Sequence, residues 1–107
     1  MEKRDELYLS HVTEAVEKII QFTTGRTWDD FRKDEMMQGA VIHQLMILGE
    51  AANKVSEDTQ ERMSELPWRD MVAMRNKLIH DYFHVRLEEI WRTVQEDIPN
   101  LKNILGI

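Results

Sequence analysis

Apolar side chains recur along much of the chain at intervals of three and four residues, which is the spacing of one face of an α-helix. The first such stripe consists of five aliphatic residues: Leu9, Val12, Val16, Ile19 and Ile20. It predicts a helix over about residues 5–24. Gly25 then stands where a helix commonly ends in a left-handed cap.

A second, longer stripe predicts a central helix over residues 34–55. Its members are again spaced three or four apart: Met37, Val41, Leu45, Leu48 and Ala52. Gly49 lies inside this helix, where a glycine costs about 1 kcal/mol relative to alanine. We therefore expect Gly49 to let another helix, from the same chain or from a second subunit, approach closely.

Capping residues divide the next part of the chain into shorter helices. Thr27 and Asp30 have the spacing of a capping box, and Ser56 is placed to cap a short polar segment. Pro67 suits the first turn of a further helix over about residues 67–83.

The last part of the chain is expected to break near residues 84–85, to form a helix over about residues 87–97, and to end in a short turn after Pro99. Glycine and proline are scarce and runs of β-branched residues are short, which favours helices over strands. The sequence therefore predicts an all-α fold, a four- to five-helix up-and-down bundle, as a single domain over residues 1–107.

Composition narrows the class of protein. Apolar residues make up 42% of the 107 residues and charged residues 32%, which is an ordinary globular balance. There is no cysteine, so disulfides and cysteine-ligated zinc are excluded. We expect no signal peptide and no membrane span, because no apolar stretch is long enough. A cytoplasmic location is the corresponding expectation.

The net charge of −6 argues against a protein that coats nucleic acid by charge alone. The charge is uneven, since residues 1–68 carry the whole excess of acidic side chains whereas residues 69–92 have a net charge of +1. The slightly basic segment also contains the residues with the clearest catalytic chemistry.

That segment is Arg75-Asn76-Lys77-Leu78-Ile79-His80-Asp81-Tyr82. On an ideal helix Arg75 and Tyr82 lie nearly on one line, and Asn76 lies beside His80. Arg75 and His80 are about 140° apart. They can converge if the arginine reaches around, if the helix ends near His80, or if both line a cleft, such as one between two subunits.

These residue types suit cleavage of RNA, which carries its own nucleophile in the 2′-hydroxyl group. His80 is expected to move protons, because the pKa of histidine lies near neutrality. Arg75 is expected to stabilise the charge on the phosphate. Asn76 is a candidate to orient the imidazole and Asp81 to tune it, and the chemistry requires no metal ion or other cofactor.

The residues alone leave a structural alternative open. In it, His80 is a hydrogen-bonded core residue, and Arg75 forms an ion pair with Asp70 or Glu50. Neither composition nor spacing decides between this alternative and catalysis.

The pattern Arg75-x-x-x-x-His80-x-Tyr82 resembles the signature of the HEPN superfamily in the form found in HepT toxins, and Asn76 after the arginine also fits. Further blocks resemble the family in order along the chain: Phe31-x-x-Asp34, Ala40-Val41-Ile42, Leu48-Gly49-Glu50-Ala51-Ala52, Pro67-Trp68, Met74-Arg75-Asn76, His80-Asp81-Tyr82-Phe83 and Ile90-Trp91. One departure is His43, where the family often has arginine.

The resemblance implies a helical bundle that forms a homodimer, with two motifs around a basic cleft, and that acts as a metal-independent RNA endonuclease. It also implies a partner, an MntA-like nucleotidyltransferase antitoxin that transfers AMP to the motif tyrosine, here Tyr82. An AMP group so close to Arg75 would place negative charge and bulk in the cleft, which would silence the toxin.

Two other functions compete with this interpretation. His80 and His84 are four residues apart, the spacing of a zinc-binding helix, although no third ligand stands out. The more serious alternative is a non-catalytic helical binding or regulatory partner of a minimal nucleotidyltransferase. The acidic surface and the small residues of segment 49–52 would suit docking to such an enzyme.

Overall fold

The computed structural model describes residues 1–107 and contains helices but no strands, which confirms the predicted all-α class. In chain order the elements are α1 (Lys3–Thr23), α2 (Trp28–Lys33), α3 (Glu35–Lys54), α4 (Glu57–Arg62), α5 (Trp68–His80), the 3-10 turn η1 (Tyr82–His84), α6 (Leu87–Arg92), the π-helical turn η2 (Thr93–Asp97) and α7 (Ile98–Leu105). None of the helices is both long and apolar enough to cross a membrane.

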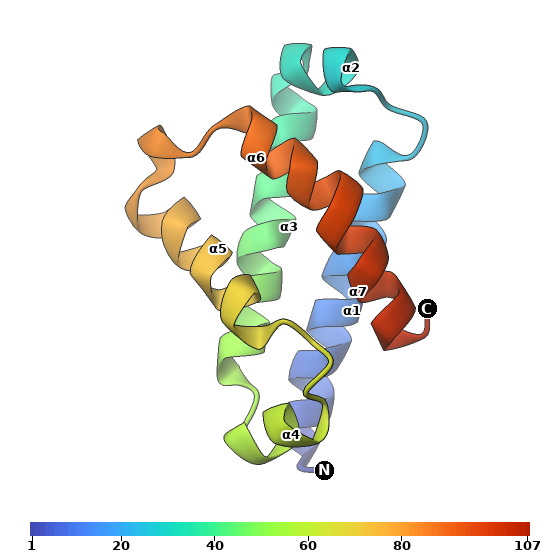
Figure 1. The fold of residues 1–107 in the computed structure, drawn as a ribbon, viewed down its shortest axis with the longest axis vertical. Coiled ribbons are helices and arrows are strands. Elements are labelled where there is room, and N and C mark those ends of the chain that lie inside the picture. Colours follow the sequence, from blue (N-terminus) through green and yellow to red (C-terminus); the bar gives the residue numbers. More distant parts are fainter.

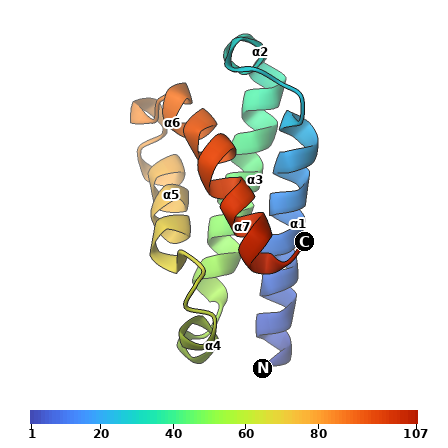
Figure 2. The same cartoon turned by 45° about the vertical axis from the view of Figure 1, so that its right-hand side comes forward.

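Four long rods make up the bundle: α1, α3, α5 and the continuous rod formed by α6, η2 and α7. They run alternately up and down, with α3 between α1 and α5 and the last rod crossing the front of the molecule (Figure 1). Figure 2 shows the short helices α2 and α4 at opposite ends of the bundle. The predicted up-and-down bundle is therefore confirmed.

Three helix boundaries follow the predicted caps. Gly25 has a φ of 75° directly after α1, and Thr27 and Asp30 form both hydrogen bonds of a capping box at the start of α2. Ser56 accepts a hydrogen bond from the backbone N–H of Thr59 at the start of α4, and Asp34, which was not predicted as a cap, accepts one from Met37 at the start of α3. These short polar side chains satisfy N–H groups that a helix leaves without partners in its first turn.

The core lies where the apolar stripes of α1 and α3 meet. Val12, Val16, Ile19 and the five members of the central stripe are all buried. Phe31 of α2 is fully buried and stacks on Trp91 of α6, with ring centroids 4.9 Å apart. Helix α2 thereby links α3 to the last rod.

A buried carboxylate, not singled out in the sequence, joins α1 to the start of α4. Asp5 is only 2% exposed and accepts hydrogen bonds from the Ser56 hydroxyl and the Thr59 hydroxyl, each at 2.6 Å. The Ser56 backbone N–H donates to it as well, at 3.0 Å. Above all the Ser56 hydroxyl, and then that of Thr59, hold the pKa of Asp5 below its ordinary value.

Helix α5 ends earlier than predicted, at His80 rather than near residue 83. Asp81 leaves the helical conformation with φ −140° and ψ 35°, and Tyr82–His84 form a separate 3-10 turn. Tyr82 and Phe83 continue the apolar content of the helix in the sequence, but they are 52% and 96% exposed. No core is present there to extend the helix, so apolar residue type was a misleading signal.

The C-terminal rod is more continuous than predicted. We expected a separate closing turn after Pro99, but helix persists from Leu87 to Leu105 through the π-helical turn before α7. Proline lacks an N–H and crowds the carbonyl four residues earlier. A wider turn just before it, together with its place in the first turn of α7, accommodates Pro99. The predicted position of Pro67 in the first turn of α5 is off by one residue, since Pro67 precedes the first helical residue.

Candidate active site

Arg75 lies on α5 at a close approach of this helix to α3, and Gly49 makes the approach possible. A Cβ atom at Gly49 would overlap Cβ of Arg75 and would lie only 2.7 Å from the carbonyl oxygen of Met71. The expected close packing at Gly49 is therefore confirmed, and the neighbour is α5 of the same chain. The Cβ and Cγ atoms of Arg75 therefore pack against the backbone of α3 at Gly49.

Two polar partners hold the Arg75 guanidinium. Its Nη2 lies 2.6 Å from Oε2 of Glu50, and its Nη1 donates a hydrogen bond of 2.7 Å to Oδ1 of Asn76. The Arg75 side chain is 23% exposed, and its Nε is buried without a hydrogen-bond partner. Of the pairings left open by the sequence, the structure contains the one with Glu50. Each terminal nitrogen carries a second N–H, so the group keeps donors that neither contact uses.

From the sequence, Glu50 was named only as one of two possible partners of Arg75, in the alternative to catalysis. It lies one residue after Gly49, so the glycine that admits α5 and the carboxylate that pairs with Arg75 are neighbours on α3. The adjacent glycine and acid in the sequence were the available signal. Only the packing of α3 on α5 shows which cation the acid meets.

His80 is the last residue of α5 and is exposed to solvent. The alternative of a buried core histidine is therefore wrong. The helix ends at this residue, which is one of the conditions under which Arg75 and His80 can face the same space. From the sequence, a helix end near His80 was only one of three ways in which Arg75 and His80 could converge.

The two supporting candidates contact other residues than expected. The amide oxygen of Asn76 accepts from Arg75 and does not bind the His80 imidazole. The Asp81 carboxylate pairs with Nδ1 of His84. In this structure Asn76 therefore positions the arginine, and Asp81 closes the turn that follows α5.

Tyr82 lies beyond the end of α5, so it does not share a helical line with Arg75. It is in the 3-10 turn, half-exposed, with its ring edge-on to Phe83 at a centroid distance of 5.8 Å. The turn places its phenol at the surface, a few residues from the end of the helix that carries Arg75.

The geometry bears on the zinc-helix alternative as well. His80 and His84 belong to different elements, and His84 is paired with Asp81. No group of three or more His, Cys, Asp or Glu side chains is arranged to hold a metal ion. The premise that the two histidines share one helical face is wrong.

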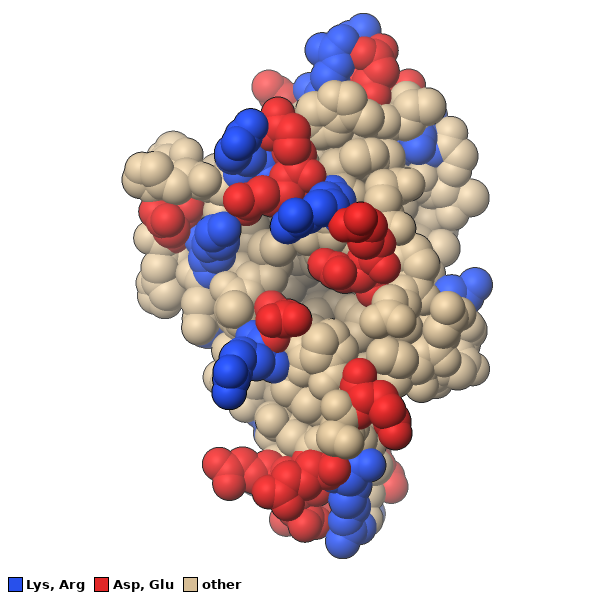
Figure 3. All heavy atoms as spheres, viewed as in Figure 1, with Lys and Arg blue, Asp and Glu red and all other residues tan.

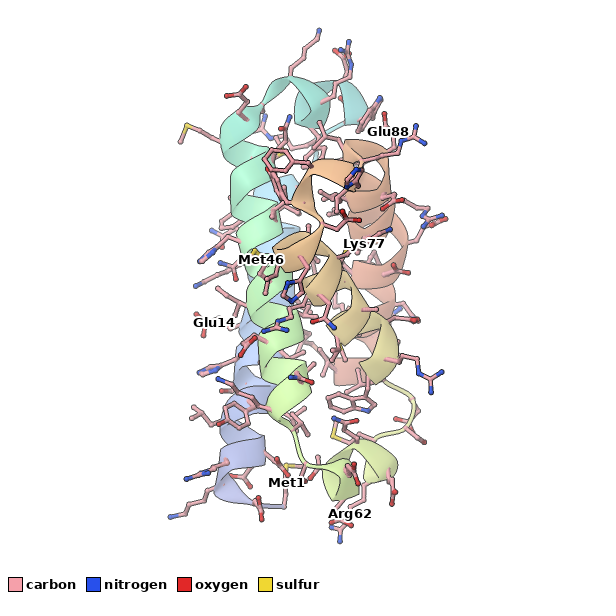
Figure 4. The ribbon with its side chains drawn as sticks, turned by 90° about the vertical axis from the view of Figure 1, so that its left-hand side faces the viewer. Met1, Glu14, Met46, Arg62, Lys77 and Glu88 are labelled. Carbon is pink, nitrogen blue, oxygen red and sulfur yellow. The ribbon has the colours of Figure 1, made fainter.

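A shallow, largely apolar groove borders the Arg75–Glu50 pair. It has a volume of about 350 Å³ and is lined mainly from α1 and α3: Tyr8, His11, His43, Met46, Ile47, Glu50, Ala51, Lys54 and Ile79. Figure 4 looks onto α3 and α5 and shows Met46 on this side, while Lys77 is placed towards the last rod. His43, the position of the family departure, is exposed along this groove.

A family model described as "Ribonuclease HepT-like" matches residues 12–106, which include every element from α1 to α7 at least in part. The chain belongs to the HepT-like ribonuclease family. This confirms the resemblance inferred from the motif blocks. No solved structure matches this one.

Relatives of similar length support the same assignment for this HepT-like chain. A protein named "Probable ribonuclease HepT" from Thermococcus cleftensis is 44% identical over 102 residues, covering 95% of this chain and 93% of the relative. A Methanocaldococcus jannaschii protein named "Putative RNase MJ1380" is 37% identical over 108 residues, covering 100% of this chain and 99% of the relative. A similarly named Caldanaerobacter subterraneus protein is 37% identical over 95 residues, covering 89% and 85%.

Proposed function

We propose that this HepT-like protein is a metal-independent RNA endonuclease, with Arg75 and His80 as its catalytic residues. The observation that carries the proposal is the contrast between these two side chains. Arg75 is held rigidly by Glu50 and Asn76 at the junction of α3 and α5, whereas His80 is free at the exposed end of the same helix. A fixed cation and an accessible imidazole are what phosphodiester cleavage needs.

In this mechanism the 2′-oxygen of the RNA attacks the adjacent phosphorus, and the bond from phosphorus to the 5′-oxygen breaks. The products are a 2′,3′-cyclic phosphate and a 5′-hydroxyl. The proton leaves the 2′-hydroxyl and a proton must reach the 5′-oxygen, which are the steps assigned to imidazole. Arg75 donates hydrogen bonds to the phosphate oxygens and stabilises the charge of the transition state.

The two proton transfers support a homodimer. One chain offers one unpaired histidine at the end of α5, since His84 is engaged by Asp81. A second copy would bring a second His80, so that one imidazole removes a proton while the other donates one. The apolar groove beside Glu50, with Met46, Ile47 and Ile79 in its lining, is a suitable contact face.

The same proposal includes a role as the toxin of a toxin–antitoxin pair in the cytoplasm. An MntA-like nucleotidyltransferase would transfer AMP from a nucleoside triphosphate to the Tyr82 hydroxyl, releasing pyrophosphate. The exposure of the Tyr82 side chain supports access by such a partner. The added phosphate would compete with RNA for Arg75 and hinder its approach.

A test of the nuclease is cleavage of RNA by the purified protein with and without EDTA. We expect activity to survive EDTA, and to fall by about 10²-fold or more in Arg75→Ala and in His80→Ala. The matched control is Arg62→Ala, since its side chain is exposed on α4 and lies outside both the motif segment and the groove. Activity that disappears with EDTA, or that is equal in all three variants, would contradict the proposal.

The pairing of Arg75 with Glu50 also favours a second candidate, a non-catalytic binding partner of a nucleotidyltransferase, because the ion pair already compensates the cation. In that case wild-type protein and both motif variants would show the same background cleavage, and a nucleotidyltransferase would still bind.

Modification of Tyr82 would be detected from the intact mass of this protein after co-expression with the nucleotidyltransferase. Tyr82→Phe would abolish the mass increase.

A further inference from the structure

Helix α5 has a second side, facing away from the Arg75–Glu50 pair, that borders a deeper cavity. The cavity has a volume of about 490 Å³ and lies between α5, α3 and the last rod. Its apolar lining comes from all three: Leu45 and Leu48, Met71 and Met74, and Ile98 and Leu101. This size is within the range of about 300–1,000 Å³ that is usual for small-molecule sites. Figure 3 shows the hollow at the centre of this face, ringed by charged side chains.

The charges around the cavity are not balanced within the molecule. Of the two cations in its lining, Lys77 is paired with Glu89 at 3.1 Å, and Arg92 lies 3.9 Å from Glu96. The two carboxylates in the lining, Asp70 of α5 and Asp97 of η2, form no ion pair and accept no side-chain hydrogen bond. The cavity rim therefore carries two exposed carboxylates without an ion-pair partner, with Arg92 compensating Asp97 only in part, above an apolar floor.

The environment of Asp97 reflects this imbalance. Loss of hydration beside the cavity raises the pKa of the Asp97 carboxyl, although the side chain is exposed, and repulsion from Glu96 and Asp70 acts in the same direction more strongly than Arg92 opposes it. A positive charge placed between the two walls would relieve that repulsion. An anion, including RNA, would add to it.

We infer that the cavity between α5, α3 and the last rod binds a small organic cation, an aliphatic amine whose ammonium group lies between Asp70 and Asp97. The carbon chain of the amine would cover the leucine and methionine floor and displace water from apolar surface. The ammonium group donates up to three hydrogen bonds, which the two carboxylates and the Asn100 amide oxygen in the same lining can accept.

Neither Arg75 nor His80 lines this cavity, so the inference does not depend on the proposed nuclease. Its test requires no RNA. Failure of the amine to bind would leave the nuclease proposal untouched, and absence of cleavage would leave this one untouched.

The experiment titrates the whole protein with hexylamine, hexanol or hexanoate at neutral pH and follows backbone amide resonances by NMR and the melting temperature. We expect hexylamine to shift resonances of the lining residues on all three elements and to raise Tm with concentration. Hexanol should bind more weakly and hexanoate not measurably. Each of Asp70→Asn and Asp97→Asn should weaken hexylamine binding by about threefold to fivefold.

Glu61→Gln on α4 is the matched control, because it removes an exposed carboxylate outside the cavity lining and should leave the affinity unchanged. Three results would overturn the inference: equal binding of hexanoate and hexylamine, unchanged affinity in both aspartate variants, or shifts confined to residues outside the cavity. Using two aspartate variants keeps the test decisive if one of them folds poorly.

Discussion

At the scale of single residues, Gly49 determines whether Arg75 can occupy its place. The overlap concerns Cβ of Arg75 and the backbone carbonyl of Met71, which belong to the frame of α5 and cannot turn aside as a flexible side-chain end would. A larger residue would therefore displace α5 from α3. The loss would affect both the stability of the bundle and the position of the guanidinium.

Gly49→Ala is expected to destabilise the protein by about 1–3 kcal/mol, because overpacking outweighs the better helix propensity of alanine. Its matched control is Gly39→Ala in the same helix, where an added Cβ would meet nothing within 4 Å. That control should be more stable than wild type by about 0.5–1 kcal/mol. Urea unfolding of both variants checks the prediction, and equal effects would contradict it.

Asp5 gives a second prediction at this scale. Its carboxylate is stabilised by the hydroxyls of Ser56 and Thr59, which lower its pKa in the folded state. A depressed folded-state pKa contributes stability above the ordinary pKa of 3.8, and this contribution is lost as the pH falls through the folded-state value. Acid should therefore weaken the link between α1 and α4.

We expect Asp5→Asn to be less stable than wild type at pH 7, and the difference in unfolding free energy to shrink below about pH 3.8. The measurement is denaturant unfolding between pH 7 and pH 2. Glu6→Gln, an exposed neighbour, is the control and should change little across this range. A deficit in Asp5→Asn that is as large at the lowest pH as at neutrality would argue against the carboxylate contacts.

At the scale of elements, α5 is the least enclosed of the four rods. It packs against α3, and towards the last rod it borders the 490 Å³ cavity, with the Lys77–Glu89 ion pair bridging to α6. The Arg75–Glu50 pair holds its other side to α3. The position of α5 thus depends on one tight backbone approach and two ion pairs of different burial.

The two ion pairs should differ in strength. Arg75 is 23% exposed, compared with 47% for Lys77, so its pairing is less screened by water. Double-mutant cycles with alanine at each partner should give a coupling of about 1 kcal/mol for Arg75–Glu50 and less than about 0.5 kcal/mol for Lys77–Glu89. A stronger coupling in the Lys77 pair would show that α5 is fixed mainly from the last rod.

At the scale of the whole molecule, the surface beside the site leaves an apolar side chain exposed. Ile79 of α5 is 41% exposed and lies at the groove lined by Met46 and Ile47, next to Glu50. In the proposed homodimer, a second copy would cover this apolar surface and contribute a second His80 to the site. Catalysis and association are therefore expected to change together.

Ile79→Glu should shift the protein from dimer to monomer and abolish RNA cleavage, while helix content stays unchanged because the side chain is already partly exposed. Light scattering after size-exclusion chromatography measures the mass, and circular dichroism measures the helices. Met36→Glu is the control, since Met36 is 86% exposed and does not line the groove. A monomeric wild type, or an active monomeric variant, would contradict the proposed two-chain site.

Much of this architecture could be predicted from residues along the chain. The stripes of α1 and α3, the capping box at Thr27 and the caps at Asp34 and Ser56 depend on neighbours within a few positions. Periodicity and capping are local effects, so they can be read without knowing the fold. The family blocks could be recognised in the same way, and they contain Arg75 and His80 as candidate residues.

Other features were decided only by packing between distant segments. The pairing of Arg75 with Glu50, the bond network of Asp5 across 51 and 54 residues, and the end of α5 at His80 depend on where other elements lie. Charge and apolarity name possible partners for a side chain but do not rank them by distance. In this protein, therefore, the sequence determined the helices and the chemical groups at the motif, whereas tertiary structure decided which groups meet, because contacts between helices depend on the whole bundle.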